Sequence, residues 1–478
     1  MQNDWAFAEM RGARLWDPRC RATLISACQR LAEQSEVSFS RALGSQRKAV
    51  SHILHHPTTT AQGLLDGHIR ATSLRCQAHA LILVASDTTI CDFTTHSAVE
   101  GMGPISSHPY QCGFLVHSAL ALSPGGIPLG LLHQQSWVRD SAVTDSPVPD
   151  SAVTDSAVTE PSLPEKAEGQ KWKESQKWKE SQKWLDALRG VEAALPPQQK
   201  ALLMQDREAD VFSFFAAPRR EGLDLLIRAT HPRRVQTQAA EGAVQTAGTL
   251  LAVAAAAPLI ASTSVPVHAR PDREARQARV SVRVCSLSVL APHQYPAPAP
   301  PPVRLQVVCA REEDPPDGVS APIHWVLLTT LAVPDADTAL RLVGYYALRW
   351  RVERFHYVLK SGCRVERLQL DTFVTLQKAM SLYSVVAWRL LHLTYLARAA
   401  PETPAWEAVS DAERGVLERA TGQTLTTVRQ VMQALARIGG FVPVPSAPEP
   451  GVKSLWLGFR RFQDMMAGFL LASQPYPT

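Results

Sequence analysis

One stretch decides how this chain of 478 residues is interpreted: Tyr345-Tyr-Ala-Leu-Arg-Trp-Arg-Val-Glu-Arg-Phe-His356. Its pattern predicts one helix over residues 341–364. At about 100° per residue, four polar side chains fall within about 60° of one another: Tyr346, Arg349, Glu353 and Lys360. An apolar stripe occupies the opposite side: Leu348, Val352, Phe355 and Leu359. This helix should therefore pack through its apolar stripe and direct the polar one outward.

The periodicity by itself leaves two interpretations of the polar stripe open. It is either a functional face or a solvated face in which Arg349 and Glu353 form an i, i+4 ion pair. Such a pair stabilises a helix by only about 0.2–0.5 kcal/mol. On helix geometry alone, the solvated face is the simpler interpretation.

The spacing Tyr346-x2-Arg349-x3-Glu353-x6-Lys360 resembles the Tyr-Arg-Glu-Lys motif of the IS-four family of bacterial insertion-sequence transposases. Further segments resemble the same family in the expected order: Asp87-Thr-Thr89, Gly113-Phe-Leu-Val-His-Ser-Ala119, Lys179-Glu-Ser-Gln-Lys-Trp184, Asp206-Arg-Glu-Ala-Asp210, Ile323-His-Trp-Val-Leu-Leu-Thr329 and Glu449-Pro-Gly-Val-Lys-Ser-Leu-Trp456. The resemblance covers nearly the whole chain, and it is strongest to the members that excise their element through hairpin ends.

This resemblance implies an RNase H-like catalytic core in which Asp87, Asp206 and Glu353 hold two Mg²⁺ ions, with Mn²⁺ as a substitute. Carboxylates are hard oxygen ligands that suit these ions, and a two-metal site activates the attacking oxygen and stabilises the leaving oxygen. Taken singly, Asp87 also reads as a turn residue and Asp206 as a helix N-cap. Each acid gains weight because it lies within its own family motif.

Six further residues are candidate DNA contacts through the same resemblance: Tyr346, Arg349, Lys360, Trp325, Trp350 and Arg228. Arg349 offers a planar fork to a phosphate, and Lys360 offers a point charge. Trp325 matches the position at which related enzymes stack a base flipped out of the duplex, although a tryptophan on a strand is more often part of a core. Arg228 resembles a phosphate-contacting strand end, with a solvated turn as the alternative.

The pattern divides the chain into three expected parts. Residues 1–75 read as a helical DNA-end-binding domain, with a helix at 21–33 and caps at Ser38 and Ser45, although a generic helical bundle fits equally well. Residues 76–371 read as an α/β catalytic core with a mixed sheet. Residues 372–478 read as a helical region for dimerisation. Short apolar runs bounded by turn residues predict the strands of the core: 81–85, 113–122, 127–133, 201–204, 225–227, 280–290, 303–308 and 323–330.

Two insertions interrupt the expected core. Residues 138–183 contain imperfect Asp-Ser-Ala-Val-Thr repeats followed by tandem Gln-Lys-Trp-Lys-Glu-Ser, a polar tract that should loop out. Its Lys-Trp-Lys units either contact DNA by charge and stacking or belong to a solvated helix start. A β-rich insertion is expected at about 230–322. Near the end, Pro443-Val-Pro-Ser-Ala-Pro448 replaces the basic, glycine-containing run of the family, which puts any contact made there in doubt.

Composition sets the remaining limits. The net charge of +5 is modest, so a nucleic-acid partner would be bound by local basic faces. The eight cysteines contain no Cys-x-x-Cys pair, which indicates neither a zinc site nor a disulfide framework and fits a reducing bacterial cytoplasm, with association to the nucleoid when DNA is bound. The uncharged stretch 242–267 contains Pro258 and Pro266, and we interpret it as interior or loop instead of a membrane span.

The expected function is cut-and-paste DNA transposition by a homodimer bound to terminal inverted repeats and target DNA. Two alternatives remain at this stage: a non-catalytic DNA-binding protein that occupies element ends, and a metal-dependent nuclease without strand transfer. A requirement for two transposon ends would exclude the nuclease.

Overall fold

The protein is described from a computed structural model, which covers residues 5–34, 37–96, 98–106, 108, 110–139, 182–238, 244–267, 276–293, 298–316, 319, 322–444 and 449–472. The repeat tract at 140–181 and residues 445–448 of the proline-rich run lie outside these ranges. The described chain is mixed α/β, and its strands form a twelve-stranded open mixed sheet. It divides into two compact units: residues 1–78, 88–180 and 351–478 form unit 1, and residues 79–87 and 181–350 form unit 2.

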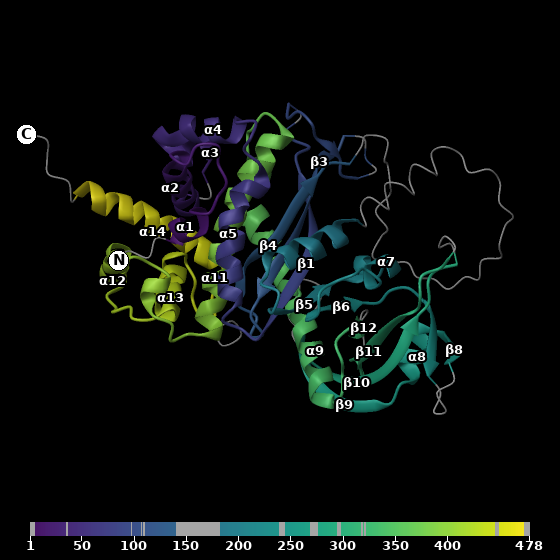
Figure 1. Ribbon diagram of the computed structural model, residues 1–478. Coiled ribbons are helices and arrows are strands. Elements are labelled where there is room, and N and C mark those ends of the chain that lie inside the picture. The colour runs from purple at the N-terminus through teal and green to yellow at the C-terminus, as the bar shows by residue number, and fades with distance from the viewer. Residues whose placement is uncertain are drawn as a thin grey trace, which may run out of the picture. The chain divides into compact units, whose positions relative to one another are not determined.

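Unit 1 is built from helices and a short antiparallel part of the sheet. Its helices are α1 (Trp5–Met10), α2 (Cys20–Glu33), α3 (Phe39–Leu43), α4 (Arg47–His55), α5 (Ala61–Cys76), most of α10 (Trp350–Tyr357), α11 (Phe373–Ala399), α12 (Asp411–Thr421), α13 (Val428–Ile438) and α14 (Val452–Ala472). Its strands are β2 (Gly103–Pro104), β3 (Cys112–Leu122) and β4 (Pro128–Trp137), together with the end of β1 (Leu81–Asp92). Figure 1 shows α5 and α11 running along β4, which both helices contact.

The long helix α11 forms the centre of unit 1 because it is apolar on nearly every side. Most of its 27 residues are buried, and Thr372 caps its first turn by accepting a hydrogen bond from the Thr375 amide. A helix that is apolar all round is buried on all sides. At its carboxyl end, Leu393 and Ala397 enter a cluster that α13 and α14 complete.

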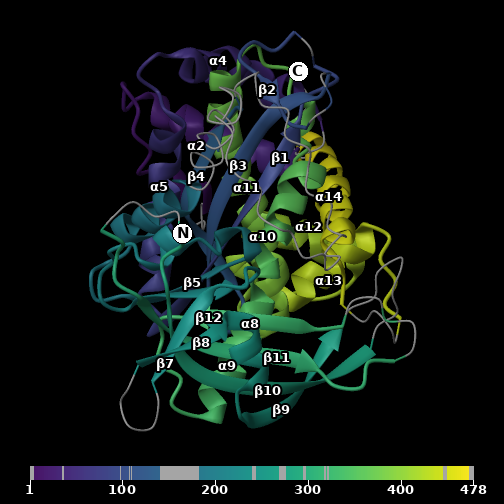
Figure 2. The ribbon, with the colours of Figure 1, turned by 90° about the vertical axis from the view of Figure 1, so that its right-hand side faces the viewer.

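Unit 2 begins with three parallel strands and continues into antiparallel ones. Its strands are the start of β1, β5 (Lys200–Gln205), β6 (Leu223–Arg228), β7 (Arg234–Gln238), β8 (Val244–Thr249), β9 (Leu259–Val267), β10 (Arg276–Val289), β11 (Val303–Glu312) and β12 (His324–Thr329). Its helices are residues 182–194, α7 (Phe212–Phe215), α8 (Leu250–Ala256) and α9 (Ala336–Leu348). Their order is β1-β5-β6-β12-β11-β10-β7-β8, and β9 also pairs with β10. Figure 2 shows β9 to β12 lying side by side.

Most of the predicted elements are present, and three expectations were wrong. The predicted strands match β3, β4, β5, β6, β10, β11 and β12 within a few residues, whereas β1 continues from its predicted end at 85 to Asp92 and so contains Asp87. Ser38 caps α3 as expected, but Ser45 lies inside a 3₁₀ turn at Gly44–Gln46 and caps nothing. Residues 242–267, interpreted as interior or loop, contain β8, α8 and β9. The predicted helix over 341–364 is interrupted after Leu348 and ends in a π-helical turn at Val358–Gly362.

No helix among the described residues is long and apolar enough to cross a membrane.

A buried ion pair ties the amino-terminal helix α1 to α5. The Glu9 carboxylate accepts a hydrogen bond from Arg75 Nη1 at 2.6 Å and one from His68 Nδ1 at 2.6 Å. The Leu131 amide donates to Nε2 of the same histidine at 3.0 Å, so His68 is neutral, in agreement with the burial that lowers its pKa. Burial alone would raise the pKa of Glu9, but the partners His68 and Arg75 lower it from 4.5 to about 2.

We predict that Glu9→Gln destabilises unit 1 by about 3–5 kcal/mol, because Arg75 then loses its buried counter-charge. Denaturation in urea measures the change. In the wild type the Glu9 contribution should be complete above pH 4.5 and decline as the pH falls towards 2, since the folded-state pKa is the lower one. The exposed Glu402→Gln is the matched control, with a change below about 0.5 kcal/mol. An equal, small effect of both substitutions would contradict the assignment.

Candidate active site

Three neighbouring parallel strands place Asp87, Asp206 and Arg228 in one row. In β1 and β5, Ala85 pairs with Met204, and in β5 and β6, Gln205 pairs with Ile227. Asp206 follows the last residue of β5, and Arg228 is the last residue of β6. Neighbouring strands are about 4.8 Å apart, and side chains alternate between faces. Two residues beyond the first pair and one residue beyond the second, the same register brings Asp87, Asp206 and Arg228 to one level, so two carboxylates and one guanidinium lie on neighbouring strands of unit 2.

Arg349 joins this row from the interruption between α9 and α10. Its Nη1 lies 3.9 Å from Asp87 Oδ2, and its side chain is hydrogen bonded to Tyr346. Both residues are buried, with exposed fractions of 8% for Arg349 and 6% for Tyr346. The expected outward-facing stripe is therefore wrong for these two residues, because they face carboxylates from distant strands instead of water.

The pKa values report a buried site of mixed charge. Burial raises the pKa of Asp206, against the lowering effect of Arg349 and Lys183. Burial also raises the pKa of Tyr346 and lowers that of Arg228, whose charge interacts with Asp206 and Arg349. A buried charge is tolerated only when it is paired, so these groups depend on one another.

The last Gln-Lys-Trp unit of the repeat, at residues 182–184, helps to hold the chain around Asp206 in place. Trp184 is 1% exposed in the helix at 182–194, and Lys183 Nζ lies 2.9 Å from Glu208 Oε2. The Glu208 amide in turn donates to Asp206 Oδ1 at 3.0 Å. This unit is core, so the suggestion that Lys-Trp-Lys units contact DNA does not apply to it; the earlier units lie outside the described residues.

Trp325 and Arg228 lie beside Tyr346. The Trp325 and Tyr346 rings make an edge-to-face contact with centroids 5.3 Å apart. Trp325 is half-buried, which matches neither a fully enclosed core residue nor a fully exposed platform. Arg228 Nη2 donates to the His324 carbonyl at 3.1 Å, which ties the end of β6 to the start of β12.

Asp210 is a site residue that the sequence reasoning missed as an individual position. Its buried carboxylate accepts hydrogen bonds from the Thr230 and His231 amides at 2.8 and 2.9 Å and from Arg233 Nε at 2.7 Å. These three hydrogen bonds from the loop after β6 fix the chain directly beyond Arg228. In the sequence, the only indication of this role was that Asp210 is the second aspartate of Asp206-Arg-Glu-Ala-Asp210. Its partners lie twenty or more residues away, so no local pattern connects them to it.

The remaining candidates divide between the units. Trp350 is 46% exposed at the start of α10. Glu353 lies in the first turn of the same helix, four residues after Arg349, and is half-buried in unit 1. Lys360 Nζ, also in unit 1, donates to the Ile90 carbonyl at 2.7 Å and lies 3.0 Å from Glu366 Oε1. Glu366 Oε1 also accepts the Asp92 amide at 2.9 Å, so Lys360 and Glu366 fasten the turn after α10 to the end of β1.

The donor set of Asp87 and Asp206 fits a hard divalent cation. Mg²⁺ is usually held by one or two carboxylates, with water and substrate phosphates as its other ligands. Within the described residues, no three histidine, cysteine, aspartate or glutamate side chains are grouped closely enough to hold a metal ion. The strand row therefore supplies a pair of oxygen ligands, with Arg349 beside them.

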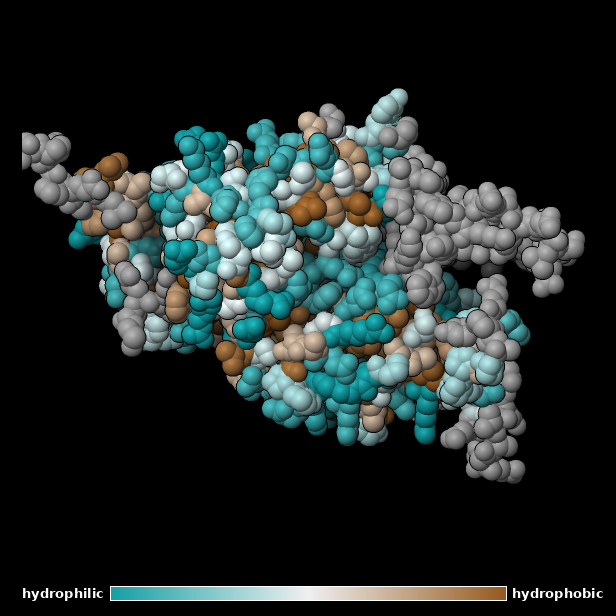
Figure 3. Space-filling view, turned by 45° about the horizontal axis from the view of Figure 1, so that its top comes forward, coloured by the Kyte–Doolittle hydropathy of each residue, from teal (hydrophilic) through white to brown (hydrophobic). Residues whose placement is uncertain are grey.

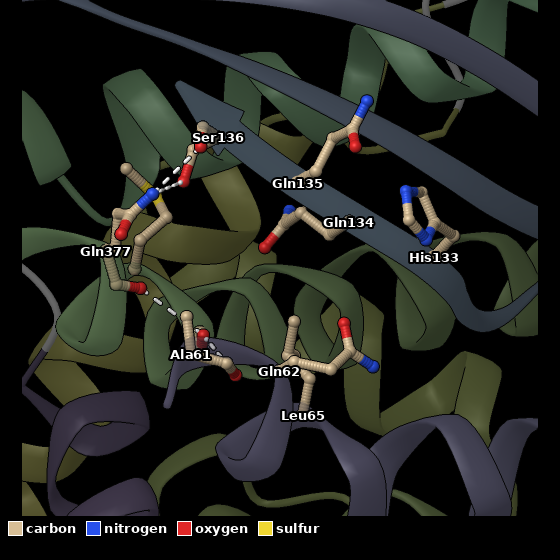
Figure 4. Close-up of a pocket in the computed structure, with 10 residues that line it drawn as sticks. Ala61, Gln62, Leu65, His133, Gln134, Gln135, Ser136 and Gln377 are labelled. Carbon is tan, nitrogen blue, oxygen red and sulfur yellow. Dashed lines mark hydrogen bonds between the residues drawn. The ribbon is translucent and has the colours of Figure 1, made fainter. Parts of the chain in front are cut away.

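A cavity of about 240 Å³ in unit 1 has different chemistry. Neutral side chains from α5, β4 and α11 line it, and several of them bond within the protein: Gln377 Nε2 to the Ser136 carbonyl and hydroxyl, and Ser381 Oγ to the Ala61 carbonyl. Figure 4 shows the amides of Gln134, Gln135 and Gln377 around it. It lacks carboxylates, so it is unsuited to hold Mg²⁺.

We predict that Asp210→Ala destabilises unit 2 by about 3–5 kcal/mol, because the substitution removes a buried carboxylate and leaves the half-buried Arg233 and two amides without their acceptor. Thermal unfolding followed by circular dichroism measures the loss. The exposed Glu221→Ala in the same unit is the matched control and should stay within about 0.5 kcal/mol of the wild type. Equal melting of the two variants would mean that the loop is held by other contacts.

Comparisons with known proteins give one family. Residues 135–388 match the model of the transposase DDE domain, a range that includes Asp206 and Glu353 and begins after Asp87. Among solved structures, the chain is similar to a piggyBac transposase in a synaptic complex with hairpin DNA, determined by cryo-electron microscopy. The two share 9% identity over 97% of this chain and 75% of that chain, with a TM-score of 0.34.

Proposed function

The chain belongs to the transposase DDE domain family, and from this premise we propose that it is a cut-and-paste DNA transposase of the IS-four type, acting on the ends of an insertion sequence. The observation that carries the proposal is the convergence of four side chains: Asp87 within β1, Asp206 directly after β5, Arg228 at the end of β6 and Arg349 at the interruption after α9. DNA transposition is the activity of this family, and its members generally use divalent metal ions. The finer assignments below are our own.

Asp87, Asp206 and Glu353 are proposed as the ligands of two Mg²⁺ ions in an RNase H-like core. Bound there, the ions would activate the attacking oxygen and stabilise the leaving one. Asp87 is held within β1 and Asp206 directly follows β5, and Asp210 and the Lys183–Glu208 pair fix the neighbouring chain, so the two carboxylates are rigid ligands. Glu353 is added by its place in the motif and by its position one helical turn beyond Arg349.

The basic and aromatic groups have separate proposed tasks. Arg349 and Arg228 are suited to bind the scissile phosphate, since guanidinium groups match phosphate oxygens in pairs. Tyr346 places its hydroxyl beside Arg349 and orients that guanidinium. Lys360, Trp350 and Trp325 complete the proposed DNA contacts, Lys360 by its charge and Trp325 by stacking a flipped base.

The proposed reaction has four steps at each end. Water first cleaves one strand and frees a 3′-hydroxyl. That hydroxyl attacks the phosphodiester of the opposite strand and forms a hairpin, which a second water opens. The freed 3′-hydroxyl then joins target DNA. In every step an oxygen nucleophile attacks phosphorus and a 3′-oxygen leaves, so one set of ligands serves all four.

The three parts of the chain are proposed to share the work as the sequence suggests. Residues 1–75 would bind the transposon end, residues 76–371 would carry the chemistry, and residues 372–478 would form a homodimer. The exposed apolar side chains Met465, Phe469 and Leu471 on α14 support the last assignment. In Figure 3 a hydrophobic group lies at the left, where α14 ends.

We predict that the wild type nicks a labelled duplex carrying the flanking inverted repeat in Mg²⁺ and converts the nick to a hairpin. Glu353→Ala, Asp87→Asn and Asp206→Asn should each lower both products by at least about a hundredfold, because each removes a metal ligand. Gel-shift binding of the same duplex should be retained. Glu402→Ala, at an exposed position, is the control.

If the wild type binds the duplex without cleaving it, the protein is a non-catalytic end-binding protein instead of an enzyme. Cleavage without any need for two ends, and without joining to target DNA, would identify a nuclease.

A second prediction separates nicking from hairpin formation. Trp325→Ala should lower hairpin yield by about tenfold or more while nicking continues, because stacking a flipped base contributes roughly 1–3 kcal/mol. Trp325→Phe should recover part of the loss. Trp406→Ala, which removes an exposed tryptophan, should leave both steps unchanged. Equal loss of nicking and hairpins in Trp325→Ala would assign this residue to the core.

A further inference from the structure

The position of Arg349 is unusual for a residue meant only for DNA. Its side chain is 10% exposed, its Nη1 lies 3.9 Å from Asp87 Oδ2, and its charge interacts with Asp206. Burying a cation is unfavourable unless an opposite charge compensates it. Two carboxylates on adjacent strands likewise repel each other unless a cation lies between or beside them. Arg349 and the two aspartates therefore satisfy each other's charge within the protein itself.

The surrounding groups do not replace Arg349 in this task. Arg228 interacts with Asp206, but it is tied to the His324 carbonyl and faces Arg349 as a like charge. Lys183 lowers the pKa of Asp206, but its Nζ forms an ion pair with Glu208 Oε2 at 2.9 Å. Tyr346 holds the Arg349 side chain from the helix. Arg349 Nη1 lies within ion-pair range of Asp87 Oδ2, at 3.9 Å.

We propose that Arg349 is a built-in counter-cation of the Asp87–Asp206 pair, which a divalent ion displaces when it binds. A dication and a guanidinium beside the same carboxylates repel each other, so metal entry moves the guanidinium off the pair. The released Arg349 guanidinium can then bind the phosphate of a phosphodiester. Metal binding and phosphate binding become coupled through one side chain, and the coupling is reciprocal.

This inference rests on the proposed function, since it takes Asp87 and Asp206 as metal ligands. It adds a role for Arg349 before DNA arrives. Arg349 acts here as a positioning residue, through the carboxylates and not on the reacting atoms. A purely structural role would change stability without improving the affinity for metal.

The test is Mn²⁺ binding to the full chain without DNA, measured by isothermal titration calorimetry and by the loss of the free-Mn²⁺ electron paramagnetic resonance signal. Arg349→Gln should bind Mn²⁺ about tenfold or more tightly than the wild type, because the competing charge is gone. Arg349→Lys should stay near the wild type, since it keeps the charge. Arg304→Ala is the control, as it removes an exposed arginine of unit 2 and should change nothing. Asp87→Asn should weaken binding in every background, which locates the measured site.

Circular dichroism melting of each variant establishes that it is folded, and Arg349→Met provides a second neutral variant should Arg349→Gln unfold. Equal or weaker Mn²⁺ affinity in the folded neutral variants overturns the inference. The DNA cleavage assay on the wild type is run in parallel. If the wild type cleaves DNA but the neutral variants bind Mn²⁺ no more tightly, the proposed function stands and only the role of Arg349 is removed. If the wild type neither binds Mn²⁺ nor cleaves DNA, both proposals are removed.

Discussion

The parallel pairing of β1, β5 and β6 is the constraint on which the site in unit 2 depends. Three residues from distant parts of the chain reach one row because their strands pair in a single register: Asp87 lies within β1, Asp206 follows β5, and Arg228 ends β6. A shift of one residue in either pairing would turn a carboxylate to the opposite face. The apolar runs of β5 and β6, buried on both faces, fix that register.

Charge balance is the second requirement, and it follows from the first. Once two carboxylates share an edge, cations must lie nearby, and the helix interruption after Leu348 supplies Arg349 at that point. The loop locked by Asp210 and the helix carrying Lys183 hold the rest of the surroundings in place. The family's transposition chemistry needs such a rigid, charged edge, because phosphoryl transfer relies on positioning and electrostatic stabilisation.

Sequence reasoning predicted the strands of the core, because apolar runs and turn residues are local signals, but it ended the first strand before Asp87, which lies within β1. It failed where burial depends on distant partners. Tyr346 and Arg349 looked like an exposed stripe, since periodicity cannot reveal carboxylates from other strands. The strands β7 to β9 were not predicted individually, because β7 has one apolar residue in five and β8 and β9 are rich in Thr, Ser and Ala, so none has an apolar run like those of β5 and β6. Lys183 was assigned to the repeat loop at 138–183, although it is buried in the helix at 182–194.

The central claim is that the Asp87–Asp206 pair binds the divalent ion at which DNA is cut. Anomalous X-ray scattering from crystals of the protein with Mn²⁺ and a duplex carrying the inverted repeat tests it most directly. The account predicts an anomalous peak within coordination distance of both carboxylates, with Arg349 turned to a phosphate. A peak at another group of side chains, with Arg349 still paired to Asp87, would contradict it.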